Sequence, residues 1–169
     1  VWLWRRTPHR VEAEIIRDAM LATSGVLDKT QFGPGTLDES HRRRSIYFMV
    51  KRSRLISLMQ LFDQPEPLVS VGGRPTTTIA PQALAIMNNP QIREYAKAFA
   101  KKLRAEKGES LEAAIERGYR TAVGRDPTAE ETADATAFIA AQQATYAEQK
   151  NADGEMLALA DFCQVLFGL

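Results

Sequence analysis

The sequence has few of the side chains that catalysis and metal binding most often use. Its 169 residues include one cysteine, Cys163, and two histidines, His9 and His41. One thiol excludes an internal disulfide and a cysteine zinc cluster, and two histidines this far apart disfavour a histidine metal site. We therefore expect no cofactor or metal in this chain.

Long apolar runs and a strong net charge are also lacking. No apolar stretch approaches the roughly 20 residues that span a bilayer, and the opening Val1-Trp2-Leu3-Trp4 run is too short for a signal-peptide core. The 22 basic residues are nearly balanced by 21 acidic ones, which leaves a formal net charge of +1. Whole-molecule electrostatics would not hold the chain on a nucleic acid or an anionic membrane, so any attraction to anions must be local.

What remains is the composition of an ordinary globular domain. The chain is 44% hydrophobic and 25% charged, and it is long enough to bury one core. We predict a single helical domain over residues 1–169. Because the chain starts on apolar residues without a methionine, we expect it to be a fragment of a larger multidomain protein.

Helical spacing dominates the N-terminal segment. Thr7-Pro8 predicts an N-cap followed by a proline in the first turn, and Gly25 predicts the end of that helix. Its apolar residues recur at helical spacing: Val11, Ile15, Ala19 and Ala22.

The middle of the chain is irregular. Residues 26–39 and 69–79 are rich in glycine, proline and short polar residues, which predicts loops. Residues 46–50 form a short apolar run that we expect to be extended. Ser53 is expected to cap a short helix whose apolar side is formed by Leu55, Leu58, Met59 and Phe62.

Start and stop signals of helices return in the C-terminal half. One helix is expected over residues 80–88, and Asn89-Pro90 predicts the start of the next, with Ile92, Ala96, Phe99 and Leu103 facing inward. Ser110 and the Thr128/Glu131 capping box predict two more helices, and the last is expected over residues 155–167. The fold class is therefore all-α: an irregular bundle of about seven helices with an irregular lobe at 26–79 and a C-terminal bundle at 80–169.

Two basic clusters and a threonine-rich turn are the candidate functional features. Arginine forks suit phosphate, sulfate or carboxylate, so these arginines predict an anion site or an interdomain contact: Arg42, Arg43, Arg44, Arg52, Arg54 and Arg74. The alternative is that they pair internally with Asp38, Glu39, Asp63 and Glu66. No recognition helix, stacking motif or zinc signature accompanies them, which argues against nucleic-acid binding.

Polar residues near the helix that starts at Ala80 complete the candidate set. Gly72-Gly73-Arg74 precedes a run of threonines, a pattern that resembles an anion nest but lacks the lysine of a phosphate-binding loop. Thr76 and Thr77 brace the turn in the alternative interpretation, and Gln82, Asn88 and Asn89 cap helix ends.

Catalytic residues are not evident in the sequence. No serine lies in a glycine-flanked elbow, and neither histidine has a spacing that nominates a partner. Cys163 lies on an apolar helical stripe, which predicts a buried structural thiol rather than a nucleophile. We therefore expect that this domain alone is not an enzyme.

Several strings in their order resemble a known family. They are Arg43-Arg44-Ser45-Ile46-Tyr47, Phe62-Asp63 followed by Pro65 and Pro67, Thr76-Thr77 through Ala80-Pro81-Gln82, Asn88-Asn89-Pro90, and Gly124-Arg125-Asp126-Pro127-Thr128. Together they resemble the C-terminal domain of unknown function in large planctomycete cytochrome-c-associated proteins. The resemblance runs along nearly the whole chain.

The resemblance implies a setting rather than a reaction. Such proteins look exported, periplasmic or at the cell surface, with a c-type cytochrome module before this domain and genes near enzymes of polysaccharide degradation. Since this chain has no CxxCH motif, any haem would belong to another part of the parent. Three hypotheses follow: a non-catalytic scaffold domain that contacts the preceding domains, a binding module for acidic or sulfated polysaccharide, and part of a composite active site.

Overall fold

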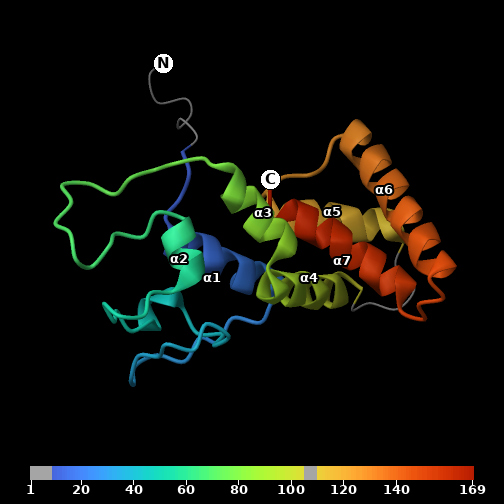
Figure 1. The fold of residues 1–169 in the computed structure, drawn as a ribbon. Coiled ribbons are helices and arrows are strands. Elements are labelled where there is room, and N and C mark those ends of the chain that lie inside the picture. Colours follow the sequence, from blue (N-terminus) through green and yellow to red (C-terminus); the bar gives the residue numbers. More distant parts are fainter. Residues whose placement is uncertain (1–8, 105–109) are drawn as a thin grey trace, which may run out of the picture.

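The computed structural model describes residues 9–104 and 110–169 (Figure 1). Seven α-helices and one 3-10 turn occur in this part of the chain, and the only β-type pairs in it are isolated bridges. The elements are α1 (Ala13–Ser24), η1 (Ser45–Tyr47), α2 (Ser57–Leu61), α3 (Ala80–Asn88), α4 (Pro90–Leu103), α5 (Leu111–Ala122), α6 (Ala129–Glu148) and α7 (Gly154–Leu166). The predicted all-α irregular bundle is confirmed.

The larger of two hydrophobic clusters lies among α4, α5, α6 and α7. Phe99 and Leu103 of α4 meet Ile115 of α5, Ile139 of α6 and Leu159 of α7, all of them fully or almost fully buried. The predicted inward stripe of α4 is confirmed. Each large apolar side chain buried in this way stabilises the fold by about 1.5–3 kcal/mol.

A close approach of α5 to α7 depends on a glycine. A Cβ at Gly118 would lie 3.1 Å from a methyl carbon of Leu166 and 3.3 Å from the ring of Phe162. The absence of a side chain at Gly118 therefore allows these two helices to pack closely.

The second hydrophobic cluster joins α1 and α2 to the N-terminal half of α4. Leu21 and Met59 are its central residues, and Ile92 and Tyr95 extend it from α4. Helix α4 therefore contributes to both clusters. In Figure 1 the long connections around η1 and α2 lie at the opposite end of the molecule from α5 and α6.

Helix α1 does not bury the apolar repeat seen in the sequence. Val11, Ile15, Ala19 and Ala22, which recur at helical spacing, are exposed. The buried residues are Ala13, Arg17, Met20, Leu21 and Ser24. Both sets recur at helical spacing, and tertiary contacts to α2 and α4 favour the second.

The ends of α1 agree with the sequence only at one terminus. The predicted Thr7-Pro8 start lies outside the described residues, and the helix begins at Ala13. Its end is confirmed at Gly25, which adopts a left-handed backbone conformation with φ of 78°.

Two predictions in the middle of the chain fail in whole or in part. Of the segment 46–50 that was predicted to be extended, residues 46 and 47 lie in the 3-10 turn η1, where the Ser45 amide and hydroxyl both bond to Asp18 at 2.7 Å. Phe48 is extended and forms an isolated bridge with Thr36. Ser53 does not cap α2, which begins at Ser57 after a tight turn closed by the Arg54 amide and the Lys51 carbonyl.

Helix starts in the C-terminal half agree with the sequence. The Asn89 side chain accepts hydrogen bonds from the first amides of α4, and Ser110 accepts one from Ala113 at the start of α5. Thr128 and Glu131 form the predicted reciprocal capping box of α6. We predicted that residues 1–169 form one domain, with an irregular lobe at 26–79 and a helical bundle at 80–169. This division stays a prediction.

Candidate functional site

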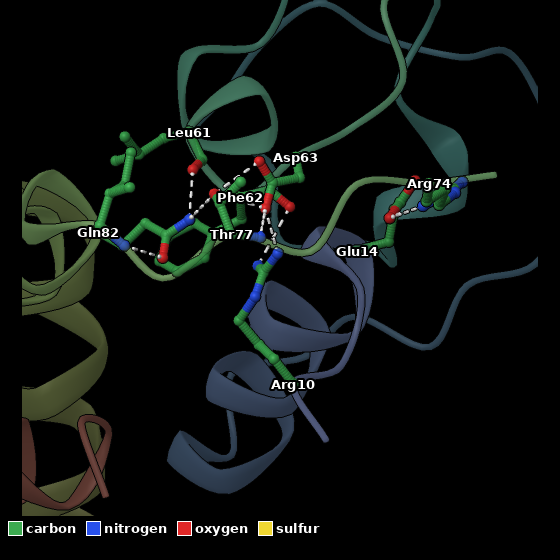
Figure 2. Close-up of polar contacts among 9 residues, drawn as sticks. Arg10, Glu14, Leu61, Phe62, Asp63, Arg74, Thr77 and Gln82 are labelled. Atoms are coloured by element: carbon green, nitrogen blue, oxygen red, sulfur yellow. Dashed lines mark hydrogen bonds and ion pairs between the residues drawn. The ribbon is translucent and has the colours of Figure 1, made fainter. Parts of the chain in front are cut away.

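Asp63 connects three segments of the chain. It follows α2 and adopts a left-handed backbone conformation with φ of 65°. Its carboxylate accepts hydrogen bonds from the Thr77 amide at 2.8 Å and the Thr77 hydroxyl at 2.9 Å (Figure 2). Arg10, which precedes α1, pairs with the same carboxylate and donates to the Phe62 carbonyl at 3.3 Å. Asp63 therefore holds together the start of α1, the end of α2 and the threonine-rich turn.

These donors also determine the ionisation of Asp63. The hydrogen bond from the Thr77 amide lowers the pKa of Asp63, and the Thr77 hydroxyl and the Arg10 charge act in the same direction. A carboxylate with a lowered pKa is a weak base at neutral pH. The arrangement favours a structural role over proton abstraction.

Gln82 continues this network into α3. Its buried side-chain amide donates to the Leu61 carbonyl at 3.0 Å and to the Thr77 hydroxyl at 3.3 Å, while its carbonyl oxygen accepts from the Ile79 amide at 3.3 Å. Gln82 thus joins the start of α3 to the end of α2. We call Arg10, Asp63, Thr77 and Gln82 the Asp63 junction.

Arg74 lies beside the junction and over α1. Its guanidinium pairs with Glu14 at 2.8 Å (Figure 2). It also pairs with Glu12 at 3.3 Å. Burial alone would raise the pKa of Glu14, but the hydrogen bond and charge of Arg74 outweigh it and the pKa is lowered. Arg74 is therefore engaged within the chain, as internal pairing would predict, although its carboxylate partners are not those expected.

Residues of both ion pairs line a hollow of about 370 Å³. Its polar lining includes Arg10, Asp63, Arg74, Glu12 and Thr76. The apolar lining comes from Val11, Ile15 and Phe62. Because each cation here has a carboxylate partner, the hollow offers no uncompensated positive charge to an anion.

The remaining predicted arginines do not converge on this hollow. Arg43 directs its guanidinium to the carbonyls of Thr30, Phe32 and Pro34. Arg44 pairs with Asp18 at 3.3 Å and lines a separate hollow of about 410 Å³.

Arg42, Arg52 and Arg54 are exposed, and within residues 9–104 and 110–169 their side chains make no hydrogen bond or ion pair. The predicted set thus divides into three arginines held by the fold and three that face solvent.

The predicted asparagines have separate positions. Asn89 caps α4, with its side-chain oxygen 2.8 Å from the Gln91 amide. Asn88 is exposed at the end of α3. Of the predicted polar residues, Thr77 and Gln82 are the two that the structure brings into direct contact, at the Asp63 junction. That these residues form an anion or interdomain contact stays a prediction.

Arg17 is an important residue that the sequence analysis missed. It is 1% exposed, and its guanidinium donates to the carbonyls of His41 and Arg43 and to the Ser45 hydroxyl. It also lies 4.7 Å from the centre of the Phe48 ring. Burial lowers the pKa of Arg17. Arg17 shares a helical face with Ala13 and Leu21, and this spacing is the signal that could have identified it.

Arg10 was missed as well, because it lies outside the basic clusters. No motif or spacing in the sequence connects it with Asp63, which is 53 residues away.

A comparison with protein families places the chain in one of them. Residues 1–139 match the family described as PSD1, protein of unknown function (DUF1553). The chain belongs to the PSD1 family. The match covers α1 through α5 and part of α6. Helix α7 lies outside the matched residues and packs against α4 and α6. No curated protein and no solved structure matches the chain.

The described residues of this PSD1 domain contain neither a metal-binding cluster nor a membrane-spanning helix. Within the described residues, no three His, Cys, Asp or Glu side chains form a group that could hold a metal ion. No helix in the same part of the chain is long and apolar enough to cross a membrane. Cys163 is buried on α7, as predicted, and burial raises the pKa of its thiol.

Proposed function

We propose that this PSD1 domain is a non-catalytic interaction domain, and that the exposed face of α1 contacts another domain of the parent protein. The observation that carries the proposal is the exposure of Ile15 on α1 and of Val11 just before the helix begins. Ile15 is 50% exposed and lines both the 370 Å³ hollow and the 410 Å³ hollow. Exposed apolar side chains that line hollows can accommodate side chains from a partner.

The polar groups around this face support binding rather than turnover. Arg10 and Arg74 are paired with carboxylates, and Asp63 is held ionised by its donors. Such pairs hold the lining of the hollow in one arrangement, and an ionised carboxylate with a lowered pKa is a weak base.

The wider setting of the proposal comes from the motif resemblance. We infer an exported protein, periplasmic or at the cell surface, in which a c-type cytochrome module carries the haem and this domain acts as a scaffold. A link to polysaccharide degradation and a planctomycete origin belong to the same proposal.

The polysaccharide hypothesis rests on fewer residues than the sequence suggested. Arg42, Arg52 and Arg54 are available to an external ligand, whereas Arg43, Arg44 and Arg74 already have partners in the fold. The composite active site also stays a prediction. Its residues would have to lie against a cleft of the parent protein.

A matched pair of substitutions tests the proposed function. Ile15→Asp places a charge on the α1 face, and Val165→Asp places one on α7 at a residue that is also 50% exposed. Binding of the PSD1 chain to the N-terminal part of the parent, supplied as a separate polypeptide, would be measured by calorimetry. We expect Ile15→Asp to weaken binding at least tenfold, because it desolvates a charge against apolar surface, and Val165→Asp to leave it unchanged. Equal effects of the two variants would contradict the proposal.

A further inference from the structure

Phe32 occupies an exposed loop in a conformation that its side chain disfavours. Its φ is 65°, in the left-handed region, and its side chain is 82% exposed. A bulky residue in this region is strained, and a solvated aromatic ring gains nothing from burial. Both costs are explained if the ring enters an apolar environment outside the chain.

Hydrogen bonds to Tyr47 and Arg43 fix the loop that carries Phe32. Its amide donates to the Tyr47 hydroxyl at 2.8 Å, and Arg43 bonds to the carbonyls of Thr30, Phe32 and Pro34. The Arg43 guanidinium lies 3.5 Å from the centre of the Tyr47 ring. Phe32 is therefore a fixed projection rather than the end of a free loop.

A second exposed apolar segment, residues 46–50, lies next to the loop that carries Phe32. Ile46 and Val50 are 74% and 66% exposed, and Met49 between them is also exposed. The two segments are hydrogen-bonded to each other through Thr36, whose amide donates to the Tyr47 carbonyl and whose carbonyl accepts from the Met49 amide, both at 2.9 Å. Both segments lie at the end of the molecule away from α5 and α6 (Figure 1).

Positive charge is concentrated in the same stretch. Residues 28–54 contain seven basic residues and three acidic ones, whereas the whole chain has a surplus of only one positive charge. Five of these cations are exposed and have no ion pair within the described residues: Lys29, Arg42, Lys51, Arg52 and Arg54. We call residues 28–54, with their apolar tips and free cations, the basic face.

We propose that the basic face docks on an anionic phospholipid surface, with Phe32, Ile46 and Val50 entering the headgroup layer and the cations contacting lipid phosphates. Exposed aliphatic and aromatic side chains interleaved with lysine and arginine are the combination that an anionic bilayer surface accommodates. A sulfated glycan would use the cations but leaves Ile46 and Val50 without an apolar partner. The lipid surface therefore accounts for more of the observed residues.

This inference goes beyond the proposed function, which uses the α1 face. The two surfaces adjoin at the 410 Å³ hollow, which Ile15 and Ile46 both line. Tests of lipid binding are therefore placed on Phe32, Arg52 and Arg54, which line neither hollow.

The test is sedimentation of the full chain with vesicles of phosphatidylcholine, with or without phosphatidylglycerol. We expect binding only to the anionic vesicles and its loss at high salt. Phe32→Gly should weaken binding roughly tenfold without lowering the unfolding temperature, because glycine suits the left-handed backbone. Arg52→Ala and Arg54→Ala should each weaken it about fivefold. Met87→Ala and Lys101→Ala, at an exposed apolar and an exposed basic residue elsewhere, should leave binding unchanged.

Three results would overturn the proposal. One is equal binding to neutral and anionic vesicles, and another is unchanged vesicle binding by Phe32→Gly. The third is retention on a sulfated glycan resin without vesicle binding, which would assign the basic face to a polysaccharide. Failure of Ile15→Asp to disturb domain contacts would leave these results unaffected, so the two proposals fail separately.

Discussion

The helices α4 to α7 and the segment between α1 and α3 are stabilised in different ways. The four helices bury apolar side chains such as Phe99 and Ile139 against one another. The other segment contains a five-residue helix and a 3-10 turn, and its long connections are fixed by Arg17, Arg43 and Asp63. The free energy gained by burying apolar side chains depends little on their orientation. Hydrogen bonds from a guanidinium to particular backbone carbonyls are directional, so they select one path of the backbone. Loops of defined shape, such as the one that presents Phe32, require the second kind of contact.

The largest expected effect is in the helical cluster. Phe99→Ala removes a fully buried ring and should lower the free energy of unfolding by about 3–5 kcal/mol. Val165→Ala, at an exposed position on α7, should change it by less than about 0.5 kcal/mol. Urea unfolding followed by circular dichroism measures both. A small effect of Phe99→Ala would show that the comparison is wrong for the region assigned to apolar packing.

Removal of the buried guanidinium tests the polar region. Arg17→Met keeps the length of the side chain but leaves the carbonyls of His41 and Arg43 without their donor, at a cost of roughly 2 kcal/mol. Arg44→Met is the control, because that side chain is exposed and its pair with Asp18 should contribute less than about 1 kcal/mol. Equal costs for the two variants would show that Arg17 contributes no more than a surface charge.

Phe32→Gly should stabilise the fold although it deletes a ring. Glycine removes the cost of the left-handed backbone, about 1 kcal/mol for a residue with a Cβ, and the exposed ring contributes no burial. Phe32→Ala keeps the strained backbone and should not show this gain. Thermal unfolding of the two variants distinguishes them, and a loss of stability in Phe32→Gly would mean that the ring packs within the fold.

The smallest expected effect is a change in pH dependence at Asp63. Its pKa is lower in the folded state than in the unfolded chain, so its stabilisation is present above the unfolded pKa of about 3.9. That stabilisation is lost as the pH falls through the lower, folded-state pKa. Asp63→Asn should therefore flatten the acid side of the stability profile measured by urea unfolding.

Glu131→Gln provides the comparison at the start of α6. Hydrogen bonds from Arg125 and from the Thr128 amide lower the pKa of Glu131 to about 2, so its contribution is lost as the pH falls through that value. A profile of Asp63→Asn identical to that of the unmodified chain would rule out a contribution of the Asp63 junction to stability.

The sequence predicted most accurately where structure is local. Asn89-Pro90, Ser110 and the Thr128/Glu131 pair specify helix starts within four residues, and all three were confirmed. The inward stripe of α4 was also correct because only one of its faces is apolar. Local signals of this kind depend on backbone geometry that neighbouring residues share.

The errors and omissions arise where contacts between residues far apart in the sequence determine the local structure. Helix α1 has two candidate stripes, and only contacts with α2 and α4 select the one containing Arg17. The turn η1 depends on Asp18, which is 27 residues away from Ser45. The Asp63 junction likewise joins residues more than fifty positions apart, and sequence spacing carries no record of that distance.

Helix α4 connects the two hydrophobic clusters, because each cluster includes residues from it. Ile92 and Tyr95 at one end belong to the cluster with α1, while Phe99 and Leu103 at the other belong to the cluster with α7. Helix α4 has 14 residues, and at about 1.5 Å per residue it is a stiff rod about 21 Å long. If a partner bound on α1 rotated or shifted α4, side chains in both clusters would move together. Binding at one end of the helix would then change packing at the other end, without a change in the path of any loop.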